Sequence, residues 1–216
     1  LGKIKNKNIL TYGINKKADY RISNIRYGVI HSKFDLNYNN LNNKKALIKN
    51  INLKLMGEHN VLNATAAIAV CINLGIKIKI IKKALKNFSG VQRRMTKIFT
   101  KKNNDFFDDY AHHPTEINSV LNGVNKVYKD RKIIAVFEPH RYSRLISLKS
   151  SFSKSFIKSD LVLICPIYAA GEKKNSSFNL LNFARLISKN SRTQVILVKS
   201  QKELSNYFKK NLISNE

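Results

Sequence analysis

Two short runs of purely apolar residues, Ile133–Phe137 and Leu161–Cys165, constrain the fold more than any other feature of the chain. Neither run alternates with polar residues, so both faces of each segment must be covered by other parts of the protein. Strands of this kind are typical of parallel sheets, because the connecting helices pack on both faces. Helical patterns lie before, between and after the two runs. The chain is therefore predicted to contain an open, mostly parallel α/β sheet with helices on both faces.

The pattern changes near Gly90, where we expect a domain boundary that separates residues 1–90 from residues 91–216. Before it, period-2 alternation predicts a strand over residues 51–56, and two helices are expected at 61–74 and 78–88. Beyond it, strands and helices alternate to the end of the chain. The expected strands are 96–100, 106–110, 133–137, 161–165 and 195–198. One helix is expected to begin at Pro114, and three more are expected at 148–157, 180–187 and 202–210.

The composition indicates a folded protein with a large excess of positive charge. Hydrophobic residues make up 43% of the 216 residues, which is too many for a disordered chain. The net charge of +27 suggests a polyanionic partner, but the lysines are scattered and the aromatic residues do not interleave with them, so we regard nucleic-acid binding as unlikely. No apolar run is long enough to cross a membrane, and both cysteines lie in apolar runs, as free thiols of cytoplasmic proteins do. We expect no membrane partner and a cytoplasmic location.

Three unusual stretches directly follow predicted strands: residues 108–114, 138–144 and 168–172. In an open α/β sheet the ligand lies beyond the carboxyl ends of the strands, so we expect these stretches to converge at one edge. The second stretch carries Arg141 and Arg144, and two guanidinium groups at such an edge favour binding of a carboxylate or phosphate.

Each of these features also has a simpler interpretation. Asp108, Asp109, His112 and His113 contain metal-ligand side chains, but adjacent histidines diverge and no spaced third ligand follows. Arginines are common in solvated loops, so Arg141 and Arg144 alone do not prove a site.

The residues near the start of the helix expected at 61–74, and those just after Gly90, have alternatives of the same kind. Asn60 is suited to helix capping, although Asn60 and Asn63 together present two carboxamides that suit the flat edge of an adenine. Arg93 and Arg94 are consistent with either a basic hinge or a phosphate contact.

Five motifs in order carry a family resemblance. They are Gly57-Glu58-His59-Asn60-Val61-Leu62-Asn63, Gly90-Val91-Gln92-Arg93-Arg94, Asp108-Asp109-Tyr110-Ala111-His112-His113-Pro114-Thr115-Glu116, Pro139-His140-Arg141-Tyr142-Ser143-Arg144 and Tyr168-Ala169-Ala170-Gly171-Glu172. Together with Leu10–Gly13 and Ala18-Asp19, they make residues 10–172 resemble the Mur ligases, in particular those that add L-alanine to UDP-N-acetylmuramate. A Mur ligase that attaches a preformed tripeptide shares the third motif but differs in the fourth.

The resemblance implies a domain arrangement and a cofactor. Residues 1–90 resemble the end of the central ATPase domain, and residues 91–216 resemble the C-terminal, Rossmann-like domain. No Gly-x-x-x-x-Gly-Lys-Ser/Thr occurs in the 216 residues, and the chain opens with Leu1, so we expect a fragment that lacks the phosphate loop and is inactive alone. The cofactors implied are ATP and Mg²⁺, with the Mg²⁺ ligands outside this sequence.

The resemblance also implies a reaction and the residues that serve it. An acyl phosphate of UDP-N-acetylmuramate would react with the amine of L-alanine. ATP would contact His59, Asn60, Asn63, Arg94 and Asp109. L-alanine would contact Tyr110, His112, Arg141 and Arg144, while Tyr168 and Glu172 would support these residues without touching the ligand. The main alternatives are the tripeptide-adding ligase and, in another class, a basic nucleic-acid-binding protein.

Overall fold

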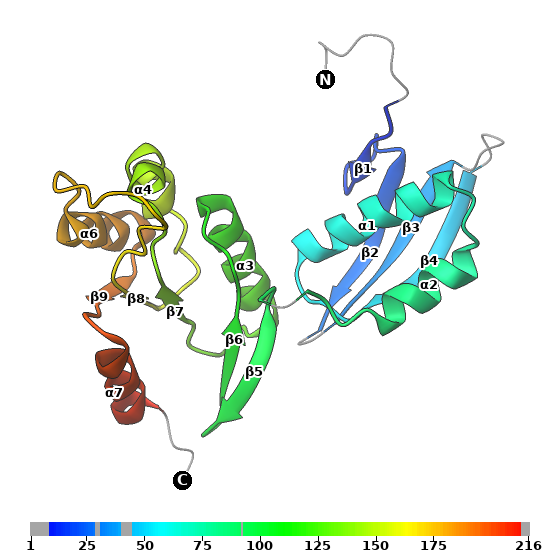
Figure 1. Ribbon diagram of the computed structural model, residues 1–216. Coiled ribbons are helices and arrows are strands. Elements are labelled where there is room, and N and C mark those ends of the chain that lie inside the picture. Colours follow the sequence, from blue (N-terminus) through cyan, green and yellow to red (C-terminus); the bar gives the residue numbers. More distant parts are fainter. Residues whose placement is uncertain (1–8, 29–30, 40–44, 92, 213–216) are drawn as a thin grey trace. The chain divides into compact units, whose positions relative to one another are not determined.

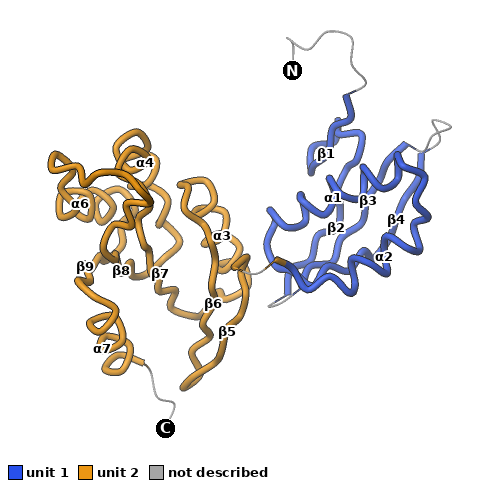
Figure 2. Tube along the Cα trace, in the orientation of Figure 1, with its two compact units in different colours: residues 1–90 blue, residues 91–216 orange. Residues whose placement is uncertain are grey.

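The computed structural model describes residues 9–28, 31–39, 45–91 and 93–212, and it divides into two compact units, Leu1–Gly90 and Val91–Glu216 (Figure 2). Each unit has its own hydrophobic core. Gln92, which belongs to the second sequence motif, and the opening residues 1–8 lie outside the described residues.

Unit 1 is a four-stranded sheet with two helices packed on one face (Figure 1). The strands are β1 (Tyr12–Gly13), β2 (Tyr20–Tyr27), β3 (Ser32–Asn39) and β4 (Lys45–Leu53), in that order across the sheet. β1 pairs with β2 in parallel, and the other pairs are antiparallel. Helix α1 (Glu58–Asn73) contacts β1, β2 and β3, and α2 (Ile78–Asn87) contacts β4.

The strand predicted at residues 51–56 is only the end of β4, and strands β1, β2 and β3 were not predicted. The signal in β3 was present, because Phe34, Leu36 and Tyr38 are buried and alternate with more exposed polar residues. In β2 the alternation is broken where Asn24 has a φ of 51° and the pairing with β3 changes register. The predicted helices agree with α1 and α2 to within three residues at each end.

Unit 2 contains a two-stranded antiparallel hairpin and a separate three-stranded parallel sheet. The hairpin pairs β5 (Thr96–Lys101) with β6 (Asn104–Asp108), and the parallel sheet has the order β7 (Ile134–Phe137), β8 (Leu161–Ile164), β9 (Gln194–Leu197). The predicted α/β class with a parallel sheet is confirmed, although the parallel part is smaller than expected.

Helices cover both faces of the parallel sheet, as the two apolar runs predicted. On one face, α3 (Pro114–Val127), α5 (Lys149–Ser153) and α6 (Leu180–Ser191) pack around Val162 and Ile164 of β8. On the other face, α7 (Gln201–Asn211) packs against Leu161 and Leu163. All four residues of β8 are at most 1% exposed, which explains why this strand shows no polar alternation.

Of the helix predicted at residues 148–157, only α5 (Lys149–Ser153) is helical, and a second short helix that was not predicted, α4 (Tyr142–Ser147), precedes it across Leu148. The hydroxyls of Ser153 and Ser155 donate to the carbonyls of Ser150 and Ser151, so side chains compete with the helical backbone where α5 ends. The unpredicted helix α4 places Arg141 and Arg144 at the start of a helix and not in a loop.

Candidate functional site

Four rings from three separate loops of unit 2 meet beyond the carboxyl ends of its strands. The rings of Tyr110 and His112 follow β6, His140 follows β7 and Tyr168 follows β8. His112 and His140 stack with ring centroids 6.1 Å apart, and both contact Tyr110, at 5.0 and 6.3 Å. The ring of Tyr168 packs edge-on against His140 at 5.3 Å. The predicted convergence of the three stretches is therefore confirmed.

Backbone hydrogen bonds continue the parallel pairing past the ends of β7 and β8. The amide of Tyr168 donates to the carbonyl of Pro139 at 2.9 Å, and the amide of Arg141 donates to the carbonyl of Tyr168 at 3.0 Å. His140 and Tyr168 thus form an isolated parallel bridge. The bridge fixes the start of α4 relative to the loop that follows β8.

The N-terminus of α3 orients His112. The Nδ1 atom of His112 lies 2.8 Å from the carbonyl oxygen of Tyr110, while the amides of His112 and His113 both donate to Glu116, at 3.1 and 3.2 Å. His113 is the N-cap residue, because its Nδ1 accepts from the amide of Thr115 at 3.3 Å, and Pro114 follows it. Pro114 therefore begins a helix as predicted.

Glu116 belongs to the third sequence motif but was given no role in the site, although its position three residues after the cap of a helix is the signal of a capping box. Burial opposes ionisation of its carboxyl group. The amides of His112 and His113, with the charges of His112 and Arg94, nevertheless hold the pKa of Glu116 below its usual value. Glu116 is thus a carboxylate that anchors the first turn of α3 beneath the ring cluster.

Arg141 and Arg144 flank the first turn of α4. Arg141 is the exposed N-cap residue with a φ of 65°, and Arg144 is half-buried in the first turn. Among the described residues, neither guanidinium lies within ion-pair distance of a carboxylate. Both charges are therefore available for an anion from outside the chain.

The segment 93–95 is attached to the β6–α3 loop by Asp109. Its carboxylate accepts from the amide of Met95 at Oδ2 and from the amide of Ala111 at Oδ1, both at 2.8 Å. The guanidinium of Arg93 lies over the Tyr110 ring, 4.9 Å from its centroid. Arg94 pairs with Glu116 at 3.7 Å. Asp109 thus has a structural task that the sequence did not reveal.

In unit 1, the three residues assigned to the adenine lie at the start of α1 and differ in exposure. Asn63 is exposed and His59 is half-buried, but Asn60 is only 7% exposed and its amide donates to the carbonyl of Met56 at 2.8 Å. The N-cap of α1 is Gly57, which has a φ of 94°, so Asn60 is not the capping residue. The shared face predicted for Asn60 and Asn63 is therefore only partly accessible.

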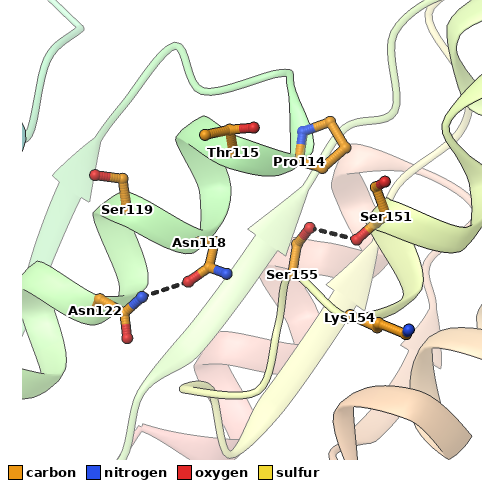
Figure 3. A pocket seen from close by; sticks show the side chains of 8 residues that line it. All are labelled: Pro114, Thr115, Asn118, Ser119, Asn122, Ser151, Lys154 and Ser155. Carbon is orange, nitrogen blue, oxygen red and sulfur yellow. Dashed lines mark hydrogen bonds between the residues drawn. The ribbon is translucent and has the colours of Figure 1, made fainter.

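A polar pocket of about 380 Å³ lies between α3 and α5, and none of the four rings lines it (Figure 3). It is lined by Pro114, Thr115, Asn118, Ser119, Asn122, Ser151, Lys154 and Ser155. Asn118 and Asn122 bond to each other, and the hydroxyl of Ser155 donates to the carbonyl of Ser151, so much of the lining is internally satisfied.

Two further features concern metals and membranes. Within residues 9–28, 31–39, 45–91 and 93–212, no group of three or more His, Cys, Asp or Glu side chains is arranged to hold a metal ion. In the same part of the chain, no helix combines the length and apolarity that a membrane span requires.

Comparisons with known proteins agree on one family across both units. The family described as "Mur ligase, glutamate ligase domain" matches residues 93–214, and the family "Mur ligase middle domain" matches residues 1–71. A UDP-N-acetylmuramate–L-alanine ligase of Pelagibacter ubique is 48% identical over all 216 residues, which correspond to 47% of that relative. The chain therefore spans about half the length of this curated relative.

Two solved structures show the same arrangement of elements. The crystal structure of a UDP-N-acetylmuramate–alanine ligase from Thermotoga maritima has a TM-score of 0.69 and 29% identity, and the match covers 91% of this chain and 41% of that one. A murein peptide ligase of Psychrobacter arcticus has a TM-score of 0.61 and 24% identity, with 95% and 41% of the two chains covered. The second likeness concerns the fold alone.

Proposed function

Because the chain belongs to the Mur ligase family, we propose that its 216 residues carry the amino-acid site and part of the ATP site of an L-alanine-adding ligase. The observation that carries the proposal is the meeting of Tyr110, His112 and His140 beside the first turn of α4, where two guanidinium groups have no carboxylate partner in the described part of the chain. The relative at 48% identity, which aligns with every residue of the chain, supports L-alanine as the amino acid.

The reaction is the ATP-dependent formation of an amide bond. A carboxylate is a poor electrophile, so the carboxylate of UDP-N-acetylmuramate first attacks the γ-phosphorus of ATP, and ADP leaves. The amine of L-alanine, in its neutral form, then attacks the carbon of the acyl phosphate. Inorganic phosphate leaves, the nitrogen loses a proton to solvent, and the amide remains.

Unit 2 contributes the positioning of the amino acid. Arg141 and Arg144 hold the carboxylate of L-alanine, because guanidinium groups match the two oxygens of a carboxylate. Tyr110 and His112 form the wall against which the methyl group and amine are placed. Fixing the amine next to the acyl phosphate removes orientational freedom, which is a large part of the barrier to such a reaction.

The assignments to ATP are His59, Asn60 and Asn63 in unit 1, and Arg94 and Asp109 in unit 2. Asn63 is the more accessible of the two carboxamides. Arg94 must exchange its contact with Glu116 for a phosphate oxygen, and Asp109 must accept a ribose hydroxyl in addition to two backbone amides. The described residues offer no cluster that fits Mg²⁺, so no step is assigned to a metal here.

A chimeric ligase tests the proposal. In it, these 216 residues replace the aligned part of the Pelagibacter ubique relative, and phosphate release is measured with ATP, UDP-N-acetylmuramate and L-alanine. We expect turnover that depends on L-alanine and not on the tripeptide. Turnover with the tripeptide alone would support the recycling ligase. A folded chimera that is inactive beside an active parent would refute the proposal.

Binding to nucleic acid is the alternative from another class, and the net charge of +27 is its only support. The 216-residue chain is mixed with duplex DNA at about 0.15 M salt, where non-specific electrostatic binding is already weakened. Tight binding under these conditions, with an inactive chimera, would favour the alternative.

A further inference from the structure

Helix α4 has no cap from its own N-terminal residues. Arg141 occupies the N-cap position, but its side chain accepts no hydrogen bond and its φ of 65° is rare for a residue with a side chain. The free amides at the start of a helix need acceptors from elsewhere. In this protein the acceptor comes from the loop after β8, 29 residues further along the chain.

Glu172 supplies that acceptor with both carboxylate oxygens. The amide of Ser143 donates to Oε2 at 3.0 Å, and the hydroxyl of Ser143 donates to Oε1 at 2.5 Å. The bond from the Ser143 hydroxyl is the main reason that the pKa of Glu172 lies below its usual value, and the bond from the Ser143 amide is the second. The positive charge of Arg141 contributes further. Glu172 is therefore ionised at neutral pH and acts only as an acceptor.

The loop that carries Glu172 is itself fixed. Ala170 and Gly171 both have positive φ values, of 49° and 86°, and the amide of Glu172 donates to the carbonyl of Ala169 at 3.1 Å. Tyr168, four residues earlier, bonds through its backbone to Pro139 and Arg141. The chain from residue 139 to residue 143 is thus held at three alternate positions by residues 168–172.

We propose that Glu172 is a positioning residue that fixes the direction in which α4 presents Arg141 and Arg144 to the carboxylate of the amino acid. The inference rests on the proposed function for the role of the two arginines. Glu172 bonds to Ser143, which lies between them, and within the described residues it forms no ion pair with either guanidinium group. The strained backbone of Arg141 is held from both sides, by Tyr168 and by Glu172 at Ser143.

The first test uses the 216-residue chain and does not depend on its function. In Glu172→Ala, amide exchange at Ser143 should be roughly tenfold faster, because a hydrogen bond to a charged acceptor is lost. The Nε resonances of Arg141 and Arg144 should shift in the same variant. Lys173→Ala, which changes the next, exposed residue, is the matched control and should leave both readouts unchanged. Unaltered arginine resonances in Glu172→Ala would overturn the inference.

The second test uses the chimeric ligase and separates positioning from general stability. Glu172→Ala should raise the KM for L-alanine roughly tenfold and leave the KM for ATP within about twofold, and Glu172→Gln, which keeps one acceptor oxygen, should recover part of the loss. Because Glu172 acts through the arginines, its effect should shrink in an Arg144→Lys background. An equal rise of both KM values, or additive effects, would assign Glu172 a merely structural role.

The two proposals fail in different ways. If Arg144→Lys does not change the KM for L-alanine, the assignment of the pocket is wrong. If Arg144→Lys does change it while Glu172→Ala does not, the pocket is right and the positioning role of Glu172 is wrong.

Discussion

Replacing Asp109 with asparagine should destabilise unit 2 even when no nucleotide is present. The two carboxylate oxygens of Asp109 each accept one backbone amide at 2.8 Å, from Met95 and from Ala111. Asparagine has one acceptor oxygen, so one of these amides would face an NH₂ group that cannot accept. The substitution keeps the size of the side chain and removes one charge-assisted hydrogen bond.

The expected magnitude follows from that single lost bond. Hydrogen bonds to charged groups contribute about 1.5 to 3 kcal/mol, and because Asp109 is only half-buried we expect the lower end, about 1.5 to 2 kcal/mol. For a unit of this size, 1 kcal/mol corresponds to roughly 3–5 °C in Tm, so the transition of unit 2 should fall by about 5–10 °C.

Differential scanning calorimetry of the 216-residue chain measures this change, because two compact units can melt as separate transitions. Asp108→Asn is the matched control. It breaks only the ion pair between Asp108 and Arg93 at 3.3 Å, whose side chains are 40% and 57% exposed, and such exposed pairs contribute about 0 to 1 kcal/mol. Equal melting temperatures for Asp109→Asn and the unmodified chain would refute the structural role and leave Asp109 to the ribose alone.

Four other outcomes are expected. In the chimeric ligase, Arg144→Lys should weaken L-alanine binding roughly 10- to 150-fold and leave the KM for ATP nearly unchanged, because lysine keeps the charge but cannot donate two parallel hydrogen bonds to a carboxylate. The opposite pattern would show that Arg144 binds the nucleotide. The 216-residue chain alone should release no phosphate from ATP above the blank, since it has no phosphate-loop sequence, and turnover would contradict this. Limited proteolysis should cut first between residues 90 and 94, and early cutting inside either core would count against two independent units. The hydrogen bond from Lys97 is the main reason that the pKa of Asp105 is lowered, so the stabilisation that ionised Asp105 gives the fold is complete at neutral pH and is lost as the pH falls below about 4. In a pH series of melting curves, Asp105→Asn should remove that part of the acid sensitivity, and an unchanged acid profile would argue against it.

The sequence signals that predicted structure correctly came from residues whose own type or burial determines the local backbone. The run Leu161–Ile164 is buried on both faces, so its lack of alternation was sufficient to predict a parallel strand. Pro114 marked the first turn of α3, because its fixed φ and missing amide suit that position. The order of strands and polar stretches then predicted the meeting of His140 and Tyr168, since the parallel strands β7 and β8 bring their carboxyl ends to one edge. Tyr110 and His112 join them from the separate hairpin strand β6.

Signals failed where a local pattern competed with distant contacts. The helix expected at residues 148–157 ends early, at Ser153, because the hydroxyls of Ser153 and Ser155 bond to nearby carbonyls. In unit 1, the bulge in β2 interrupts the alternation from which that strand could be recognised, whereas β3 was missed although its alternation is present. A sequence pattern records which side chains are apolar, but not which backbone groups will be satisfied by a remote partner.

The amino-acid sequence by itself determined the α/β class, the family resemblance and the edge at which the polar stretches gather. Only the tertiary structure decided what each polar side chain does there. It assigned the carboxylate of Asp109 to two backbone amides, the amide of Asn60 to Met56, and the carboxylate of Glu172 to Ser143. The physical reason is that a hydrogen bond requires two particular atoms, often far apart along the chain, to come within about 3 Å of each other. Hydrophobic burial, by contrast, follows residue type and periodicity, which can be read from a short stretch of sequence.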